Sequence, residues 1–218
     1  MKLTRGRQKA INKKHLITYS HPDSKVSDQF RAIRTNISFL TEEKRNRLFI
    51  ITSPGDGEGK STITANLAVS MAQQKERILL IDASLRDPII HDIFKIPNDI
   101  GLTSILSGKA NLEGAVQELG IGRLEILTSG STTFNPSELL GNTRMTELLR
   151  TVADTYDIVL IDSSPLLTST ETRVLANQCD GVVLVLNRGK TEVEKTIESR
   201  RVLDLAHANL VGAIINEK

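Results

Sequence analysis

The residues of this chain that are best suited to chemistry lie in a glycine-rich segment, Ser53–Thr62. An apolar run, Leu48–Ile51, precedes it, and a helical pattern, Ile63–Ala72, follows it. Glycines let backbone N–H groups approach phosphate oxygens, and the N-terminus of the next helix adds partial positive charge. Lys60 can offer a full charge to the β- and γ-phosphates, and Ser61 can offer a hydroxyl to Mg²⁺. This strand–loop–helix order predicts a phosphate-binding loop for a nucleoside triphosphate with magnesium.

The loop departs from the usual Gly-x-x-x-x-Gly-Lys-Ser/Thr pattern, because Pro54 stands where the first glycine belongs. The alternative interpretation is a glycine-rich turn that contains a lysine and a serine without binding phosphate. The preceding strand and the following helix favour the phosphate loop. The residues expected to contact the nucleotide are Gly57, Glu58, Gly59, Lys60, Ser61 and Thr62.

Two aspartates each end an apolar run, Asp82 after Ile78–Ile81 and Asp162 after Ile158–Ile161. Ligands of open α/β sheets bind at the carboxyl ends of the strands, and a carboxylate there can hold Mg²⁺ directly or through water. Either aspartate alone could instead be a helix N-cap. Their occurrence beside a phosphate loop predicts a magnesium site formed by Ser61, Asp82 and Asp162.

Length and composition favour one α/β domain. The 218 residues suffice for a sizeable core, and the low aromatic content of 3%, without tryptophan, fits a core of Ile, Leu, Val and Ala. Cys179 is the single cysteine, which excludes an internal disulfide and indicates a reducing compartment. Since no signal peptide and no apolar run of about 20 residues is present, we expect a cytosolic chain.

Positive charge gathers at the N-terminus, although the net charge is only +2. The basic residues that precede the first acid, Asp23, are Lys2, Arg5, Arg7, Lys9, Lys13 and Lys14. Residues 1–25 contain few large apolar side chains and are predicted to form a flexible basic arm. Such an arm can attract an anionic membrane surface or nucleic acid; a solvated tail is the alternative.

Apolar strands alternate with helical patterns through residues 26–218, which we expect to form a single domain. The expected strands are 48–52, 78–81, 124–128, 158–161, 181–186 and 210–215. The expected helices are 26–40, 62–74, 102–107, 112–119, 144–156, 171–178 and 192–208. This alternation predicts a doubly wound, mostly parallel sheet with helices on both faces. Right-handed crossovers would bring the phosphate loop and both aspartates to one edge.

These motifs resemble the bacterial tyrosine kinases, cytoplasmic autokinases of capsule and exopolysaccharide synthesis that share a P-loop fold with the MinD/ParA ATPases. The phosphate loop, Asp82-x-x-x-Arg86 and Asp162-x-x-Pro165 carry the resemblance, which covers nearly the whole chain. The further segments that carry it are Asp28–Ile37, Gly101–Thr103, Asn135–Leu140 and Gly212–Asn216. The resemblance implies binding of ATP or ADP with Mg²⁺ at Lys60, Ser61, Asp82 and Asp162. It also suggests Asn216 as an adenine contact.

The resemblance further implies a ring-shaped homo-oligomer. The family forms rings through a Glu-x-x-Arg-x-x-Arg helix motif, whose places are held here by Asp28, Arg31 and Arg34. Spacings of three and six residues put the three side chains on one helix face. Asp for Glu shortens the acid by one carbon, and an exposed charged helix is the alternative.

The chain departs from the family at Ser84, where the family has a second aspartate that is thought to activate the attacking tyrosine. A serine is a very poor proton acceptor near pH 7, and losing a general base costs on the order of 10²–10⁴ in rate. We therefore place Ser84 among the catalytic positions, with Lys60, Asp82 and Asp162, and expect slow transfer with intact nucleotide binding.

Two other departures concern substrates and the phosphate loop. The family ends in a tyrosine-rich tail, whereas the only tyrosines here are Tyr19 and Tyr156. Tyr156 is expected to be packed, which leaves Tyr19 as the internal acceptor, so either a tail was removed or the chain acts on other proteins. Gly55 replaces the early lysine that MinD/ParA proteins use across a nucleotide-sandwich dimer.

The leading hypothesis is an ATP-dependent protein-tyrosine kinase. The alternatives are a MinD/ParA-type ATPase switch, which Gly55 disfavours, and a catalytically weak nucleotide-binding scaffold, which Ser84 favours. The resemblance also implies a membrane-bound activator of the polysaccharide co-polymerase type, and through it a peripheral location at the cell membrane. Tyrosine-bearing proteins are the expected substrates, and no nucleic acid is expected.

Overall fold

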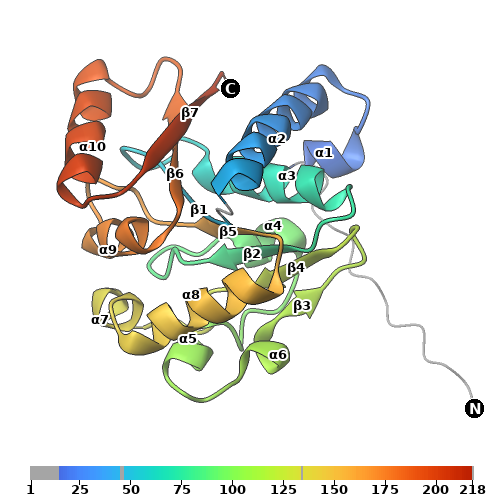
Figure 1. Cartoon of the computed structure of the whole chain (residues 1–218), viewed down its shortest axis with the longest axis vertical. Coiled ribbons are helices and arrows are strands. Elements are labelled where there is room, and N and C mark those ends of the chain that lie inside the picture. The colour runs from blue at the N-terminus through green and yellow to red at the C-terminus, as the bar shows by residue number, and fades with distance from the viewer. Residues whose placement is uncertain (1–14, 45–46, 134, 218) are drawn as a thin grey trace, which may run out of the picture.

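The computed structural model describes residues 15–44, 47–133 and 135–217, and the strands in these ranges form one twisted sheet (Figure 1). The strand order is β3-β4-β2-β5-β1-β6-β7. The strands are β1 (Leu48–Thr52), β2 (Ile78–Asp82), β3 (Gln117–Glu118), β4 (Leu124–Leu127), β5 (Ile158–Asp162), β6 (Gly181–Asn187) and β7 (Leu210–Asn216). All neighbouring pairs are parallel except β3 and β4. The predicted mostly parallel sheet is therefore confirmed, and each predicted strand agrees with the structure to within one residue.

Helices cover both faces of the sheet, as predicted for a doubly wound fold (Figure 1). The helices are α1 (Ile17–Ser20), α2 (Lys25–Lys44), α3 (Lys60–Ala72), α4 (Ile90–Phe94), α5 (Leu102–Leu106), α6 (Leu112–Ala115), α7 (Pro136–Leu140), α8 (Thr143–Thr155), α9 (Thr170–Gln178) and α10 (Val193–Leu205). Side chains of α1 to α4 join the apolar cluster on one face, and side chains of α5 to α10 join the cluster on the other. Strand β1 alternates between them: Phe49 and Ile51 enter the first cluster, and Ile50 enters the second.

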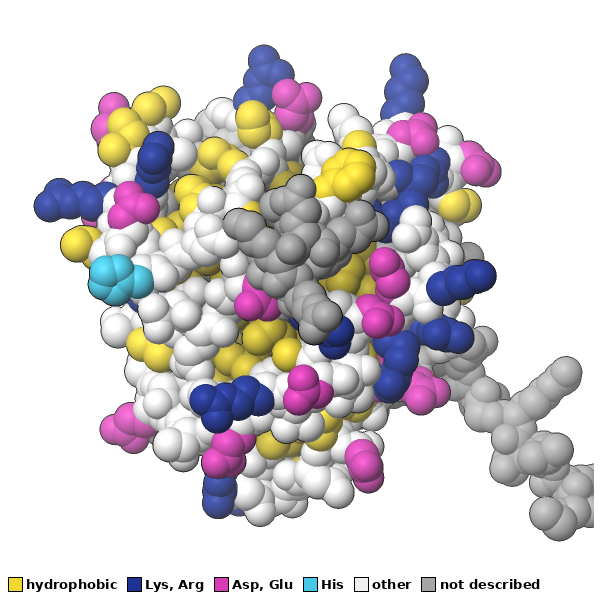
Figure 2. Space-filling view, viewed as in Figure 1, with side chains coloured by type: hydrophobic (Ala, Val, Ile, Leu, Met, Phe, Trp, Pro, Cys, Tyr) yellow, Lys and Arg dark blue, Asp and Glu magenta, His cyan; other side chains and the backbone are white. Residues whose placement is uncertain are grey.

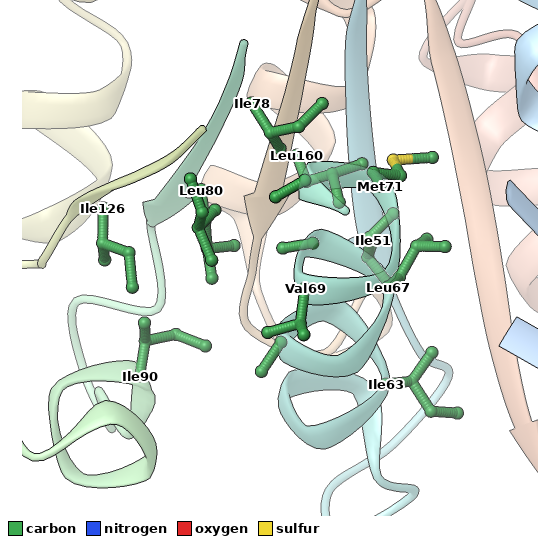
Figure 3. Close-up of a cluster of buried hydrophobic side chains, with 14 of the residues drawn as sticks. Ile51, Ile63, Leu67, Val69, Met71, Ile78, Leu80, Ile90, Ile126 and Leu160 are labelled. Atoms are coloured by element: carbon green, nitrogen blue, oxygen red, sulfur yellow. The ribbon is translucent and has the colours of Figure 1, made fainter. Parts of the chain in front are cut away.

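Helix α3 is the element that fixes the phosphate loop in place. It is buried between the sheet and helices α1 and α2. In Figure 3, Leu67 and Val69 of α3 lie among the apolar side chains that line this face of the sheet, such as Leu80 and Leu160. A helix that is apolar around most of its circumference must be buried on several sides. Because α3 is packed on several sides, the start of the helix at Lys60 has a defined place at the end of the loop.

The predicted flexible arm over residues 1–25 is wrong from residue 15 onward. Leu16 is fully buried, and the backbone N–H of Thr18 donates to Oδ1 of Asn66 at 3.0 Å. The Thr18 hydroxyl also lies 3.1 Å from the Asn66 carbonyl oxygen. The segment is polar in composition but is bound through hydrogen bonds to α3. Residues 1–14, which hold the six basic side chains, lie outside the described residues.

The sequence-based prediction was wrong for one short helix and did not include two others. The helix predicted over residues 112–119 ends at Ala115, and Gln117 and Glu118 then pair antiparallel with β4. Helices α4 and α7, of five residues each, were not predicted. Local signals are nevertheless present, since Asn111 caps α6 and Pro136 begins α7.

Two further features of the described residues are the hydrophobicity of the helices and the distribution of charge on the surface. None of the described helices is long and apolar enough to cross a membrane. Figure 2 shows acidic and basic side chains intermingled on the face in view, with no single basic patch among the described residues there.

Candidate active site

The phosphate loop connects β1 to α3 and contains two glycines in a left-handed conformation. Gly57 has φ +67°, and Gly59, the residue before the helix, has φ +92°. A side chain at either position would be strained, so these glycines are needed for the shape of the loop. The first turn of α3 then begins at Lys60 with its free N–H groups at the loop, an arrangement that attracts anions.

Glu58 lies inside the loop and connects its two sides. Its side chain is almost fully buried; Oε2 accepts from the backbone N–H of Gly55 at 2.9 Å, and Oε1 accepts from the Thr191 hydroxyl at 2.6 Å. Sequence reasoning placed Glu58 among the nucleotide contacts. Its carboxylate stabilises the loop and joins it to the segment after β6, and the nucleotide contact at Glu58 stays a prediction.

Asn216, the suggested adenine contact, also touches the phosphate loop. It ends β7, and its Nδ2 donates to the carbonyl oxygen of Glu58 at 3.0 Å. A Cβ at Gly59 would collide with the same Nδ2, which is a second reason for glycine there. The last strand therefore bounds the site directly.

Asp82 and Asp162 lie side by side at the carboxyl ends of β2 and β5. They are register partners in the sheet, and both side chains are fully buried. The backbone N–H of Ala83 donates to the carbonyl oxygen of Asp162 at 2.8 Å, which ties the two strand ends together. The structure thus brings both aspartates to one sheet edge, beside the loop.

The carboxylate of Asp162 has one buried oxygen that is unpaired. Oδ1 lies 3.2 Å from the Thr64 hydroxyl, whereas Oδ2 has no hydrogen-bond partner among the described residues. Burial raises the pKa of Asp162 to about 6, and Ser61, Lys60 and Thr64 act in the opposite direction. A buried carboxylate oxygen without a donor, next to a serine hydroxyl and a lysine, is a fitting ligand for Mg²⁺.

Asp82 differs from Asp162 because both of its oxygens are occupied. Oδ1 accepts from the N–H of Ser84 at 3.1 Å, and Oδ2 accepts from the N–H of Ile90 at 3.2 Å. Burial, and then the Asp162 carboxylate, raise the pKa of Asp82 well above its ordinary value. Asp82 therefore organises the segment from Ala83 to Ile90, a role that the sequence did not reveal.

Ser84 lies at the same edge and is almost fully buried. Its hydroxyl is 3.2 Å from the carbonyl oxygen of Asp87 and 3.4 Å from Oγ of Ser164. No ionisable side chain is hydrogen-bonded to that hydroxyl among the residues described. The position is thus beside the two aspartates, but it carries no group that could accept a proton near neutral pH.

A buried glutamate that sequence reasoning missed holds the Ser84 segment in place. Oε1 of Glu171, in α9, accepts from Nε of Arg86 at 2.7 Å, and its Oε2 accepts from the Ser137 hydroxyl at 3.0 Å. Although burial acts to raise it, these hydrogen bonds lower the pKa of Glu171. Arg86 and the segment that contains Ser137 were both recognised in the sequence as part of the resemblance. Nothing in the sequence indicated that Glu171 binds both of them.

The two tyrosines have different surroundings. Tyr156 is buried, its hydroxyl donates to Glu125 at 2.5 Å, and the guanidinium of Arg77 lies over its ring. This agrees with the expectation that Tyr156 is packed. Tyr19 is in α1 with 43% of its surface exposed, which leaves it accessible for modification.

The charged residues of α2 do not all point outward. Arg31 pairs with Asp28 at 2.5 Å and also donates to the carbonyl oxygen of Pro22 at 2.8 Å. Arg34 turns inward instead, and its NH1 donates to the carbonyl oxygen of Ser70 in α3. Arg34 is thus bound within its own chain, whereas Asp28 and Arg31 pair with each other at the surface, and the predicted ring contact through the three residues stays a prediction.

Comparison with known proteins identifies the relatives of this fold and site. Residues 47–195 match the AAA domain family. The chain is 43% identical over 205 residues to tyrosine-protein kinase YwqD of Bacillus subtilis, covering 94% of this chain and 86% of that protein. It is 34% identical over 194 residues to tyrosine-protein kinase CpsD of Streptococcus agalactiae, covering 88% and 83%.

Solved structures give the same result. The chimerical protein CapA2B2 superposes with a TM-score of 0.89 at 34% identity, covering 97% of this chain and 92% of that one. The kinase domain of Escherichia coli tyrosine kinase ETK gives 0.91 at 32% identity, covering 99% and 84%. More distantly, MinD of Pyrococcus horikoshii, complexed with Mg-ADP, gives 0.66 at 25% identity, covering 78% and 70%.

Proposed function

This chain belongs to the bacterial tyrosine kinase family, and we propose that it is an ATP-dependent protein-tyrosine kinase that acts in capsule or exopolysaccharide production. The observation that carries the proposal is the placement of the phosphate loop beside two register-paired aspartates, one of them with an unpaired buried oxygen. Phosphoryl transfer is catalysed mainly by positioning and by charge stabilisation. Both requirements are met by groups fixed at this sheet edge.

The first task of the site would be to bind and orient the phosphates of the nucleotide. The loop amides from Gly57 to Ser61 and the Lys60 ammonium would bind the phosphate chain and hold the γ-phosphoryl group in line for attack. Because α3 is packed on several sides, these groups need little reorganisation when charge develops in the transition state. The proposed nucleotide is ATP, and ADP is the product.

Ser61, Asp82 and Asp162 are the residues that we propose for Mg²⁺. The ion would neutralise charge on the phosphate oxygens when bound. Asp162 offers its unpaired Oδ2 directly, whereas both oxygens of Asp82 already accept backbone N–H groups, so Asp82 is better suited to contact through water. The match to MinD in complex with Mg-ADP supports this assignment.

Transfer to a tyrosine hydroxyl also requires that its proton be removed. The hydroxyl has an ordinary pKa of about 10 and stays protonated at neutral pH. Ser84 lies where a carboxylate would be useful, but its hydroxyl cannot take the proton. We therefore expect slow transfer by this chain, with nucleotide binding unimpaired.

We also propose that the kinase works with a second protein and with further copies of itself. The similarity to the chimerical protein CapA2B2 supports an activator, which we expect to be a membrane-bound protein of the polysaccharide co-polymerase type. Such a partner would hold the kinase at the inner face of the cell membrane. Asp28 and Arg31, exposed on α2, are the groups proposed to contact a neighbouring copy.

The proposal is tested by incubating the chain with γ-labelled ATP, Mg²⁺ and a tyrosine-bearing peptide. Label on tyrosine supports a kinase, label released to water supports an ATPase switch, and label in neither place supports a nucleotide-binding scaffold. Mg-ADP calorimetry on Lys60→Met should show a large loss of affinity, because a charge-assisted contact to phosphate contributes about 1.5–3 kcal/mol. Equal affinity in both proteins would remove Lys60 from the site.

The scaffold is the second candidate function, because Ser84 is a specific observation in its favour. It would need nucleotide binding for assembly and no phosphoryl transfer. The fold likeness to MinD alone does not favour a switch of that kind, since Gly55 provides no side chain that could reach another subunit.

A further inference from the structure

The segment that connects β6 to α10 lies directly against the phosphate loop. The Thr191 hydroxyl donates to Oε1 of Glu58 at 2.6 Å, and the same hydroxyl oxygen accepts from the N–H of Asn187 at 2.8 Å. Gly189, with φ +84°, is in a left-handed conformation in the turn between Asn187 and Thr191. Lys190 precedes Thr191 and is therefore held beside the phosphate loop, and its own N–H donates to the carbonyl oxygen of Asn187 at 3.1 Å.

The ammonium group of Lys190 points at the middle of the phosphate loop. A Cβ at Gly57 would lie only 2.5 Å from Nζ of Lys190, so the ammonium sits over the backbone at Gly57. Lys190 is exposed and forms no salt bridge with any residue that the structure describes. Its neighbour Arg188 differs, because NH1 of Arg188 pairs with Oε1 of Glu217 at 2.7 Å.

The ammonium of Lys190 thus has no acidic partner among the described residues and lies where a polyphosphate would bind. The loop itself, from Ser53 to Thr62, contains a single lysine, Lys60. A nucleoside triphosphate with one magnesium ion still carries excess negative charge, which a second cation would stabilise. We propose that Lys190 is a second cation of the nucleotide site, supplied from the same chain, that contacts the phosphates of bound ATP or ADP where they pass Gly57.

This inference rests on the proposed function, since it assigns another residue to the same nucleotide site. It also gives a second reason for glycine at position 57: a larger residue would displace the ammonium as well as strain the loop. The competing explanation is that Lys190 only screens the nearby carboxylate of Glu58. In that case its charge would matter for the loop but not for a bound phosphate.

Calorimetry with Mg-ADP and with a non-hydrolysable Mg-ATP analogue tests the inference on the full chain. Lys190→Gln keeps a long polar side chain without the charge, and Arg188→Gln is the matched control in the same segment. We expect Lys190→Gln to weaken binding by about 10-fold or more, as the loss of one charge-assisted contact implies. Arg188→Gln should stay within about 2-fold of the unmodified chain, because that charge is already paired.

Two further measurements separate a phosphate contact from loop stabilisation. Lys190→Arg should restore most of the affinity, and the salt dependence of binding should be shallower in Lys190→Gln than in the unmodified chain. The inference is overturned if Lys190→Gln binds like the unmodified chain, if it loses no more than Arg188→Gln, or if Lys190→Arg is as weak as Lys190→Gln. Failure of the unmodified chain to bind either nucleotide would instead overturn the proposed function, and this inference with it.

Discussion

Asp82 and Asp162 are register partners on adjacent parallel strands, and both carboxyl groups are fully buried. Two buried carboxylates at neighbouring positions repel each other and lose hydration, so their ionisation lowers the stability of the nucleotide-free protein. A cation bound at this edge, as proposed above, would offset this loss of stability. The pair proposed for magnesium therefore destabilises the nucleotide-free protein.

Replacing Asp162 should stabilise the nucleotide-free protein at neutral pH. Its pKa of about 6 lies above the ordinary value, so the folded state binds more protons than the unfolded state between about pH 4 and 6, and stability falls as the pH rises through that window. Asp162→Asn removes this loss, which we expect to raise the free energy of unfolding at pH 7.5 by about 1–3 kcal/mol. Urea denaturation at pH 7.5 and pH 4.5 measures it, with a much smaller difference expected at the lower pH.

Asp82→Asn is the matched control for that experiment. Both oxygens of Asp82 accept backbone N–H groups, so an amide –NH₂ would face a donor and lose one of these hydrogen bonds. Because burial also raises the pKa of Asp82, removing its charge favours folding at pH 7.5, but the lost hydrogen bond opposes this gain, so we expect a smaller net gain than for Asp162→Asn. An equal gain from both variants would mean that the difference in hydrogen bonding between the two aspartates has no energetic effect.

Ser84→Asp should speed phosphoryl transfer while lowering the stability of the nucleotide-free protein. It would supply a proton acceptor, which contributes on the order of 10²–10⁴ in rate, but it would add a third acid beside Asp82 and Asp162. Transfer to a tyrosine peptide, Mg-ADP affinity and denaturant unfolding should be measured together. Ser84→Asn, similar in size and uncharged, is the control and should stay slow. If transfer is unchanged in Ser84→Asp, Asp82 or another group performs the deprotonation.

Arg31 and Arg34 should respond differently to replacement by alanine. Arg34 donates to the Ser70 carbonyl oxygen of α3, so Arg34→Ala is expected to cost about 1–3 kcal/mol of stability by leaving that oxygen unpaired. Arg31 is exposed, so Arg31→Ala should chiefly weaken a salt-sensitive assembly. Light scattering and thermal melting distinguish the two, with exposed Arg150→Ala as control. A chain that stays monomeric at every salt and protein concentration would refute the proposed ring.

Glu171→Gln should loosen the segment that carries Ser84. The buried carboxylate accepts from Arg86 and from Ser137, and its lowered pKa means that ionised Glu171 stabilises the fold above its unfolded-state pKa near 4 and loses this effect as the pH falls through the folded value. We expect Glu171→Gln to lower the free energy of unfolding by about 1–3 kcal/mol at pH 7. Denaturant unfolding measures it, and the exposed Glu198→Gln should change little. An equal effect of both substitutions would argue against a special role for Glu171.

The sequence by itself determined the sheet, its parallel strands and the order of the phosphate loop and the two aspartates. Apolar runs indicate buried parallel strands, and the carboxyl ends of such strands lie at one edge of the sheet. Lys60, Asp82 and Asp162 could therefore be predicted to lie together from the sequence alone. Glycine at 57 and 59 likewise followed from the loop chemistry. These features depend on local periodicity and on topology rules, which a single sequence contains.

Only the tertiary structure decided how each of these groups is paired. That Asp162 has an unpaired oxygen while Asp82 has none, that Glu58 stabilises the loop, and that Arg34 turns inward all depend on residues distant in sequence. Segment 15–25 looked flexible because its own composition is polar, yet Asn66 of α3 binds it. Lys190 has no local signal at all. Its place over Gly57 results from the packing of β6 beside β1, a long-range contact that no local pattern records.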